Sequence, residues 1–224
     1  MDLKRGLSYP TLDPEWVVKV LIGTLISIIP ILNFVAIGYT MDTTRNVYHG
    51  RDTPLPEWND FGGQFIRGFL GTVLQFLWGL PLLLLACPLI FILVGSIDPS
   101  TGEPTAASGA VIACLPIAII LGVLVLSPFM MAAFTRYAVT DRFSEAMPGP
   151  VLREVSSAPR PWLLILAAAF GFVVFAIVFQ LCTLGFGALL FIPLTFYMQL
   201  VAAHWYAQAH RVASGGSAAP PSMV

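Results

Sequence analysis

Charged residues are scarce in this sequence, and their scarcity excludes several classes of protein. Only 10% of its 224 residues are Asp, Glu, Lys or Arg, whereas a soluble domain carries about 25%. The formal net charge is -1, so no broad positive field predicts binding to nucleic acid. A charge at the centre of a membrane helix costs about 2.5–3.5 kcal/mol on insertion scales. Low charge content is therefore typical of a chain that resides in lipid.

Patterns that carry catalysis are also missing. The sequence contains no His-Glu-x-x-His zinc motif, no Gly-x-Ser-x-Gly elbow and no phosphate-binding loop. Cys87, Cys114 and Cys182 stand far apart in apolar segments, without the spacing of a metal site. Asp and Glu are absent from the middle of every apolar segment, which argues against a proton-coupled carrier. We expect a protein that is not an enzyme and has no cofactor, with bound lipid as the ligand left open.

Apolar residues are abundant, at 57% of the chain with a mean hydropathy of +0.84. They gather in five segments, each near or above the ~20 residues that a helix needs to cross the hydrocarbon core. The sequence predicts an all-α, polytopic helical membrane protein with four to five transmembrane helices, in a single domain over 1–212. A disordered tail is predicted over 213–224. The five segments are 17–40, 69–95, 110–134, 162–182 and 187–206.

Lys and Arg are distributed unevenly among the connections, which predicts the orientation. The connections 41–68 and 135–161 contain arginines, and Arg211 follows the last segment. The connections 96–109 and 183–186 contain neither Lys nor Arg. By the positive-inside rule, the two arginine-containing connections and the C-terminus are expected on the cytoplasmic side of the cell membrane.

The first apolar segment leaves two topologies open. Five full spans with a cytoplasmic C-terminus put the N-terminus outside, where Lys4, Arg5 and Lys19 violate the positive-inside rule. In the alternative, Pro30 breaks segment 17–40 and the chain turns back as a re-entrant hairpin. We favour a full span kinked at Pro30, because two Pro-x-Pro motifs indicate a repeated unit.

These motifs lie in the two cytoplasmic connections, and each is predicted to precede an interfacial amphipathic helix. They occupy residues 54–56 and 148–150, and the next apolar segment begins about a dozen residues after each. Two such units on one side of the membrane would form a parallel repeat. The first helix would lie in the headgroup region or pack on the ends of the spans. Its aromatic residues share one face at spacings of three and four: Trp58, Phe61, Phe65 and Phe69.

Polar side chains within the segments and arginines beside them are the candidate contact residues. Intramembrane amides usually form hydrogen bonds between helices, and the other interpretation is a polar lining for a small solute. A histidine there can ligate a metal or a pigment, but a lone one favours hydrogen bonding. The intramembrane candidates are Gln75, Gln180, Gln199 and His204. Cytoplasmic arginines attract anionic headgroups, and the candidates for lipid or partner contacts are Arg136, Arg142 and Arg153.

A further pattern surrounds the first connection, where Leu-Pro-Glu-Trp follows a Gly-Tyr pair and an arginine. Its residues are Pro30, Gly38, Tyr39, Arg45, Pro54, Pro56, Glu57, Trp58, Phe61 and Gly68. Together with Arg136-Tyr137 and the ending around 204–208, this pattern resembles the prokaryotic family called domain of unknown function 4013. The resemblance implies a multi-pass bacterial or archaeal membrane protein and implies no activity.

Two classes of function fit these features. One is a non-catalytic scaffold or accessory subunit of a larger membrane complex, whose partners are membrane lipids and other subunits or further copies of the chain. The other is a small transporter or channel for a neutral solute or lipid. A cavity lined by Gln75, Gln180 and Gln199 would favour transport, and a flat apolar lateral surface would favour the accessory subunit.

Overall fold

The computed structural model describes residues 3–51, 55–95, 101, 106–183 and 187–216. Over these residues the protein is all-helical, with 86% helix and no strand, which confirms the predicted class. Pro54 and residues 217–224 of the predicted tail lie outside the described residues. The elements are α1 (Leu3–Ser8), η1 (Pro10–Leu12), α2 (Trp16–Ile28), α3 (Asn33–His49), α4 (Phe61–Gly95), α5 (Ala106–Thr140), η2 (Phe143–Ala146), α6 (Pro148–Ser157), α7 (Pro159–Cys182) and α8 (Ala188–Ala213).

Three described helices are long and apolar enough to cross a membrane. They are Phe61–Ile92 in α4, Val111–Thr140 in α5, and α7. Helix α8 is not among them, because its second half contains His204, Gln208 and other polar residues.

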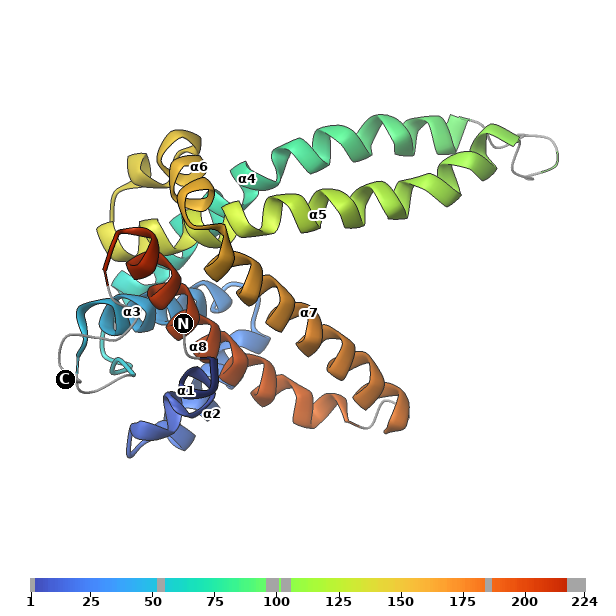
Figure 1. Ribbon diagram of the computed structural model, residues 1–224. Helices are drawn as coiled ribbons and strands as arrows, with labels where there is room; N and C mark the ends of the chain where they lie inside the picture. The colour runs from blue at the N-terminus through green and yellow to red at the C-terminus, as the bar shows by residue number, and fades with distance from the viewer. Residues whose placement is uncertain (1–2, 52–54, 96–100, 102–105, 184–186, 217–224) are drawn as a thin grey trace.

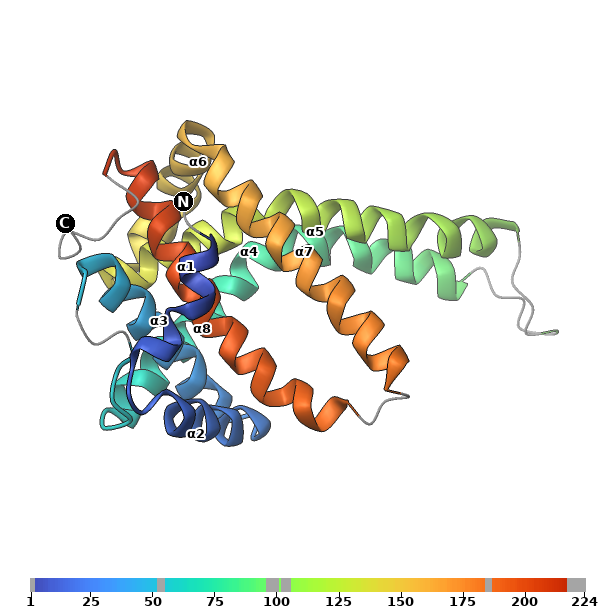
Figure 2. The same cartoon turned by 60° about the horizontal axis from the view of Figure 1, so that its bottom comes forward.

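Two helical hairpins diverge from a common head (Figures 1 and 2). Helices α4 and α5 lie side by side and extend from the head as one arm, and α7 and α8 form the second arm. Helices α1, α2, α3 and α6 gather where both arms begin. We call these helices, together with the adjoining ends of the arms, the head. The arms continue through internal prolines, including Pro81, Pro88 and Pro116, as membrane helices commonly do.

Segment 17–40 is not the continuous kinked helix that we favoured. Helix α2 ends at Ile28, the chain turns over residues 29–32, and α3 begins at Asn33. Ile29 is extended, with φ -90 and ψ 116, because a residue before proline is driven out of the helical region. The two helices then pack on each other, as in the re-entrant alternative.

The two Pro-x-Pro connections differ. In the second, α6 is a separate amphipathic helix that buries Val151, Glu154 and Val155. In the first, described residues 55–60 form no separate helix, and α4 begins directly at Phe61. The separate helix predicted there is therefore wrong. The aromatic face is instead largely part of α4. Its Phe65 and Phe69 rings lie edge-on against the Phe34 ring of α3.

Helices α3 and α4 approach each other closely at two glycines. A Cβ on Gly38 would overlap the carbonyl oxygen of Gln64, and a Cβ on Gly68 would overlap that of Phe34. Small residues permit such backbone contact between membrane helices. This contact holds α4 against the helix pair α2–α3.

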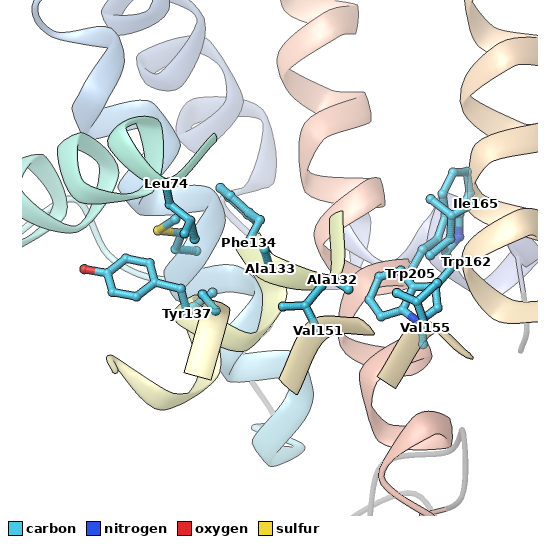
Figure 3. Close-up of a cluster of buried hydrophobic side chains, with 14 of the residues drawn as sticks. Leu74, Ala132, Ala133, Phe134, Tyr137, Val151, Val155, Trp162, Ile165 and Trp205 are labelled. Atoms are coloured by element: carbon cyan, nitrogen blue, oxygen red, sulfur yellow. The ribbon is translucent and has the colours of Figure 1, made fainter. Parts of the chain in front are cut away.

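The main hydrophobic cluster joins α4, α5, α6, α7 and α8 inside the head (Figure 3). Trp162 and Val151 are fully buried there, and Leu74 is 1% exposed. The nearby Trp205 donates its indole N–H to the carbonyl oxygen of Leu3. Both arms are thereby anchored in a single core.

Candidate functional site

A cavity of about 510 Å³ lies where α3, α4, α5 and α8 meet. We call it the amide cavity, because three carboxamide side chains line it together with hydroxyl groups. Apolar side chains, among them Ile37, Met130 and Phe134, complete its wall. Its amide and small hydroxyl residues are Asn33, Thr40, Thr72, Gln75, Ser127 and Gln199.

The three amides differ in how far the protein satisfies them. Gln75 donates its Nε2 to the carbonyl oxygen of Met130 at 3.3 Å, so α4 is tied to α5. The side-chain amides of Asn33 and Gln199 form no hydrogen bond within the described part of the chain. Both residues are partly exposed, so their amides are free to donate to and accept from a ligand.

The hydroxyl groups present acceptors. Thr40 donates to the carbonyl oxygen of Ala36 at 3.0 Å, and Thr72 donates to that of Gly68 at 2.9 Å. Ser127 likewise donates to a carbonyl oxygen of its own helix. Since the hydroxyl proton of each of these three residues is used within its own helix, the oxygen lone pairs remain as acceptors. These oxygens can accept from a ligand that carries hydrogen-bond donors.

No Asp, Glu, Lys, Arg or His lines the amide cavity, as far as the structure describes its wall. An ionic ligand would leave its charge unpaired at such a site, which is costly. The chemistry of the wall suits an uncharged molecule with a small polar part and an apolar part.

Two of the predicted intramembrane residues meet in this cavity, and two lie elsewhere. Gln75 and Gln199 line it, whereas Gln180 lies near the far end of α7 and does not. His204 is 1% exposed, lies beside the Tyr9 ring at 4.5 Å and is within 3.4 Å of the Gln208 amide. The histidine thus belongs to the packing between the N-terminal segment and α8.

The family-like pattern around the first connection forms a clamp for the connecting loop. Trp58 stacks on Tyr39 with ring centroids 3.9 Å apart. Tyr39 donates its hydroxyl to the carbonyl oxygen of Pro56 at 2.8 Å, and Trp58 donates its indole N–H to that of Lys19 at 3.2 Å. The loop residue Leu55 is 1% exposed. These residues hold α2, α3 and the loop together and have a structural role.

The same clamp contains an ionic triad in which Lys19 and Asp13 are buried and Glu57 is exposed. Lys19 is 4% exposed, and its Nζ lies 2.9 Å from Asp13 and 2.7 Å from Glu57. A buried lysine needs such partners, because an uncompensated charge in a dry environment is unfavourable. Asp13 is the buried counter-charge of Lys19, and the exposed Glu57 of the motif adds a second carboxylate from the loop.

Of the predicted lipid- or partner-binding arginines, one is internal and two are exposed. Arg136 donates to the buried Glu154 at 2.8 Å and also pairs with Glu145. Arg142 and Arg153 are exposed on η2 and α6, and neither forms an ion pair among the described residues. Of the three predicted arginines, Arg142 and Arg153 are therefore available to headgroups or to a partner, and Arg136 is not.

Arg67 joins two carboxylates with opposite pKa shifts at the head end of α4. Burial raises the pKa of the Asp42 carboxyl above its ordinary value, and the nearby Arg67 guanidinium partly offsets this effect. The pKa of the exposed Asp60 is lowered, first by the backbone N–H of Gly63 and then by Arg67. Arg67 lies 2.8 Å from Asp42 and 3.1 Å from Asp60. The network therefore fastens the start of α4 to α3.

The sequence did not indicate that Thr40, Thr72 and Ser127 line the cavity. Hydroxyl residues in helices commonly bond their own backbone, so their presence does not point to a binding site. Asn33 follows Pro30 at the break in the first segment, and this placement was the available signal. No group of His, Cys, Asp or Glu that could hold a metal ion occurs among the described residues.

These observations define the class of the molecule: an all-helical protein with helices long enough and apolar enough to cross a membrane. Within that class, the chain belongs to the family described as "Protein of unknown function (DUF4013)", whose model matches residues 22–186. No curated protein and no solved structure matches the chain.

Proposed function

We propose that this protein is a non-catalytic, multi-pass protein of a prokaryotic cytoplasmic membrane that binds and transports an uncharged solute or lipid. The observation that carries this proposal is the amide cavity, with its unpaired Asn33 and Gln199 amides and its lack of charged residues. Amides and hydroxyls bind neutral donors and acceptors, whereas the enclosing methionine and phenylalanine side chains suit an apolar part.

The proposed topology has four spans, α4, α5, α7 and α8, together with the re-entrant pair α2–α3. Helix α8 has 26 residues, so it is about 39 Å long and exceeds the ~30 Å hydrocarbon core. An even number of spans puts both termini on the same side, which we propose to be the cytoplasmic side. This supports the topology, since Lys4, Arg5 and Arg211 then all obey the positive-inside rule.

A second candidate function is an accessory subunit of a larger membrane complex. The divergence of the two arms favours it, because their outer parts extend away from one another and do not cover each other (Figure 1). Large apolar side chains on both arms have no protein neighbour over most of their surface. Examples are Leu84 at 72%, Phe91 at 78%, Leu181 at 71% and Leu190 at 70% exposure. Lipid or a partner subunit covers such faces equally well.

The test is to purify the protein in a mild detergent and to identify retained small molecules and proteins by mass spectrometry. Gln199→Met removes an amide from the cavity wall without breaking a hydrogen bond of the described structure. Gln180→Met is the matched control, because it makes the same change on α7 outside the cavity.

We expect an uncharged molecule to be retained by the wild type and by Gln180→Met, and to be depleted in Gln199→Met. Equal retention by both variants, or retention of only charged molecules, would overturn the cavity-binding proposal. Stoichiometric recovery of other membrane proteins without such a molecule would establish the accessory subunit instead. Fusion of a cytoplasm-specific fluorescent reporter to each terminus tests the topology, and a dark N-terminal fusion would refute it.

A further inference from the structure

An apolar groove of about 340 Å³ lies on the α4–α5 arm. Phe76, Gly79, Leu82, Leu83 and Ala86 of α4 form most of its wall, with Ile119 from α5 opposite. Gly79 forms part of the bottom of the groove. A Cβ built on Gly79 meets no atom within 4 Å. The space above Gly79 therefore belongs to the groove and is not filled by the protein.

The groove continues the amide cavity along the same helices. On α4, cavity residues Thr72 and Gln75 are followed by Gly79, Leu82 and Ala86 of the groove. These positions recur at spacings of three and four, so they share one face of the helix. On α5, Ile119 and the cavity residue Ser127 are eight residues apart, a little over two turns. The polar cavity and the apolar groove thus follow one another along one face of α4, and we treat the two together as a path.

The dimensions of this path fit an acyl chain. Residues Gln75 and Ala86 are separated by 11 positions on α4, which corresponds to about 16 Å of helix. This length is close to half of the ~30 Å hydrocarbon core, the depth that one acyl chain covers. The groove wall is apolar throughout, so it offers a chain contact area and no competing polar group.

The polar end restricts the headgroup. The cavity wall contains amides and hydroxyl acceptors but no Asp, Glu, Lys, Arg or His among the described lining residues. A phosphate or ammonium headgroup would find no counter-charge there, whereas a hydroxyl group would find acceptors at Thr40, Thr72 and Ser127. The match in charge therefore selects an uncharged, hydroxyl-bearing lipid over the anionic lipids of the surrounding membrane.

We propose that the amide cavity and the α4–α5 groove together bind one uncharged lipid of the diacylglycerol class, with its hydroxyl headgroup beside Gln75 and Gln199 and one acyl chain along Gly79. This inference rests on the proposed function, because the headgroup site is the same cavity. It adds the class of ligand and assigns the acyl chain to the α4–α5 groove.

The experiment uses the full chain in nanodiscs of dioleoylphosphatidylcholine that contain a small mole fraction of dioleoylglycerol, dihexanoylglycerol or dioleoylphosphatidylglycerol. Native mass spectrometry of the protein released from the nanodiscs counts the retained lipid. Gly79→Leu places a side chain into the groove, and Gly171→Leu is its matched control on α7, where a Cβ also meets nothing within 4 Å. Thermal unfolding of each variant verifies that it is folded.

We expect the wild type and Gly171→Leu to retain dioleoylglycerol in preference to the anionic lipid. Gly79→Leu should lower this retention about tenfold, the loss for roughly two methylene groups that the groove no longer covers. It should lower the weaker retention of dihexanoylglycerol by less, because Gly79 lies only about 6 Å along α4 from Gln75, so that a six-carbon chain ends near Gly79 and has few contacts beyond it to lose.

Other outcomes separate the two proposals. If Gln199→Met abolishes retention of both glycerides while Gly79→Leu has no effect, the groove assignment is overturned and the cavity-binding proposal stands. If the anionic lipid is retained as well as dioleoylglycerol, the headgroup assignment is overturned. If no lipid is retained while a small uncharged molecule co-purifies, the lipid class is wrong and the proposed function survives. Retention of nothing uncharged refutes both.

Discussion

The two halves of helix α4 have opposite surroundings. Leu74, in the half near the head, is 1% exposed, whereas Leu84, less than three turns further along, is 72% exposed. The ion pairs of the described residues all lie in the head, including those of Lys19, Arg45 and Arg136. The outer halves of the arms depend on lipid for their surroundings. We therefore expect the contacts within the head to provide most of the stability of the fold. We expect the apolar arms to place the protein in the membrane.

The largest effect is expected where the head buries charge. Lys19→Met leaves the Asp13 carboxylate, which is 2% exposed, without its counter-charge. Breaking a buried ion pair from one side costs about 3–5 kcal/mol. We expect a loss of this size in the free energy of unfolding, measured by SDS titration in detergent micelles with tryptophan fluorescence. Lys4→Met, at an exposed position, is the control and should change little.

One substitution made at two depths tests the comparison directly. Leu74→Ala removes a side chain from the main cluster (Figure 3) and should cost about 2–5 kcal/mol. Leu84→Ala removes the same atoms from a surface that contacts lipid in the membrane, and it should cost less than about 0.5 kcal/mol. Equal losses in the same SDS titration would mean that the outer arm packs on protein.

The close contact between α3 and α4 should be the next most sensitive. Gly68→Ala forces a Cβ against the carbonyl oxygen of Phe34, and overpacking of this kind costs about 1–3 kcal/mol. Gly79→Ala is the matched control in the same helix, because its Cβ meets open space. Thermal unfolding in detergent compares the two, and an unchanged melting temperature for Gly68→Ala would contradict the contact.

Tyr39→Phe removes a single hydrogen bond from the clamp. The Pro56 carbonyl oxygen loses its donor, while the stacking on Trp58 is kept. The expected loss is about 1 kcal/mol. It should appear together with faster proteolysis of the loop around residue 55, and a cleavage rate equal to that of the wild type would rule out this role of the hydroxyl.

The smallest effect is expected for Asp60, an exposed residue directly before α4. The lowered pKa of Asp60 means that its ionised form is favoured in the folded state. Its contribution is therefore complete above the ordinary Asp pKa of about 3.9 and is lost as pH falls through the folded pKa. The small difference in melting temperature between the wild type and Asp60→Asn should persist at neutral pH and vanish in acid.

The helical class and the long arms could be predicted because uninterrupted apolar runs leave the backbone few alternatives in lipid. The break at Pro30 could only be stated as an alternative, since kink and turn have the same local sequence. Their difference depends on distant residues: α2 is held by Trp58 from the first connection and by Phe196 from α8. No pattern within 17–40 contains this information.

The candidate site could be predicted in part. Gln75 and Gln199 meet in the cavity, but Gln180 does not share their depth. Gln180 lies three residues before Thr183 at the turn, whereas Gln199 lies 11 residues after the start of α8, or about 16 Å along its axis. Opposite sides of a turn therefore do not imply facing side chains. Depth along each helix decides which amides meet.

The contacts between the N-terminal segment and α8 have a consequence for synthesis. Tyr197 donates to the carbonyl oxygen of Leu7, and Trp205 donates to that of Leu3, across 190 and 202 residues of sequence. While the ribosome is still extending the chain, the α4–α5 hairpin can enter the membrane, but the N-terminal segment has no surface to dock on. The head closes only after α8 emerges. A chain that ends before α8 therefore lacks the donors of both hydrogen bonds and the surface on which α1 packs.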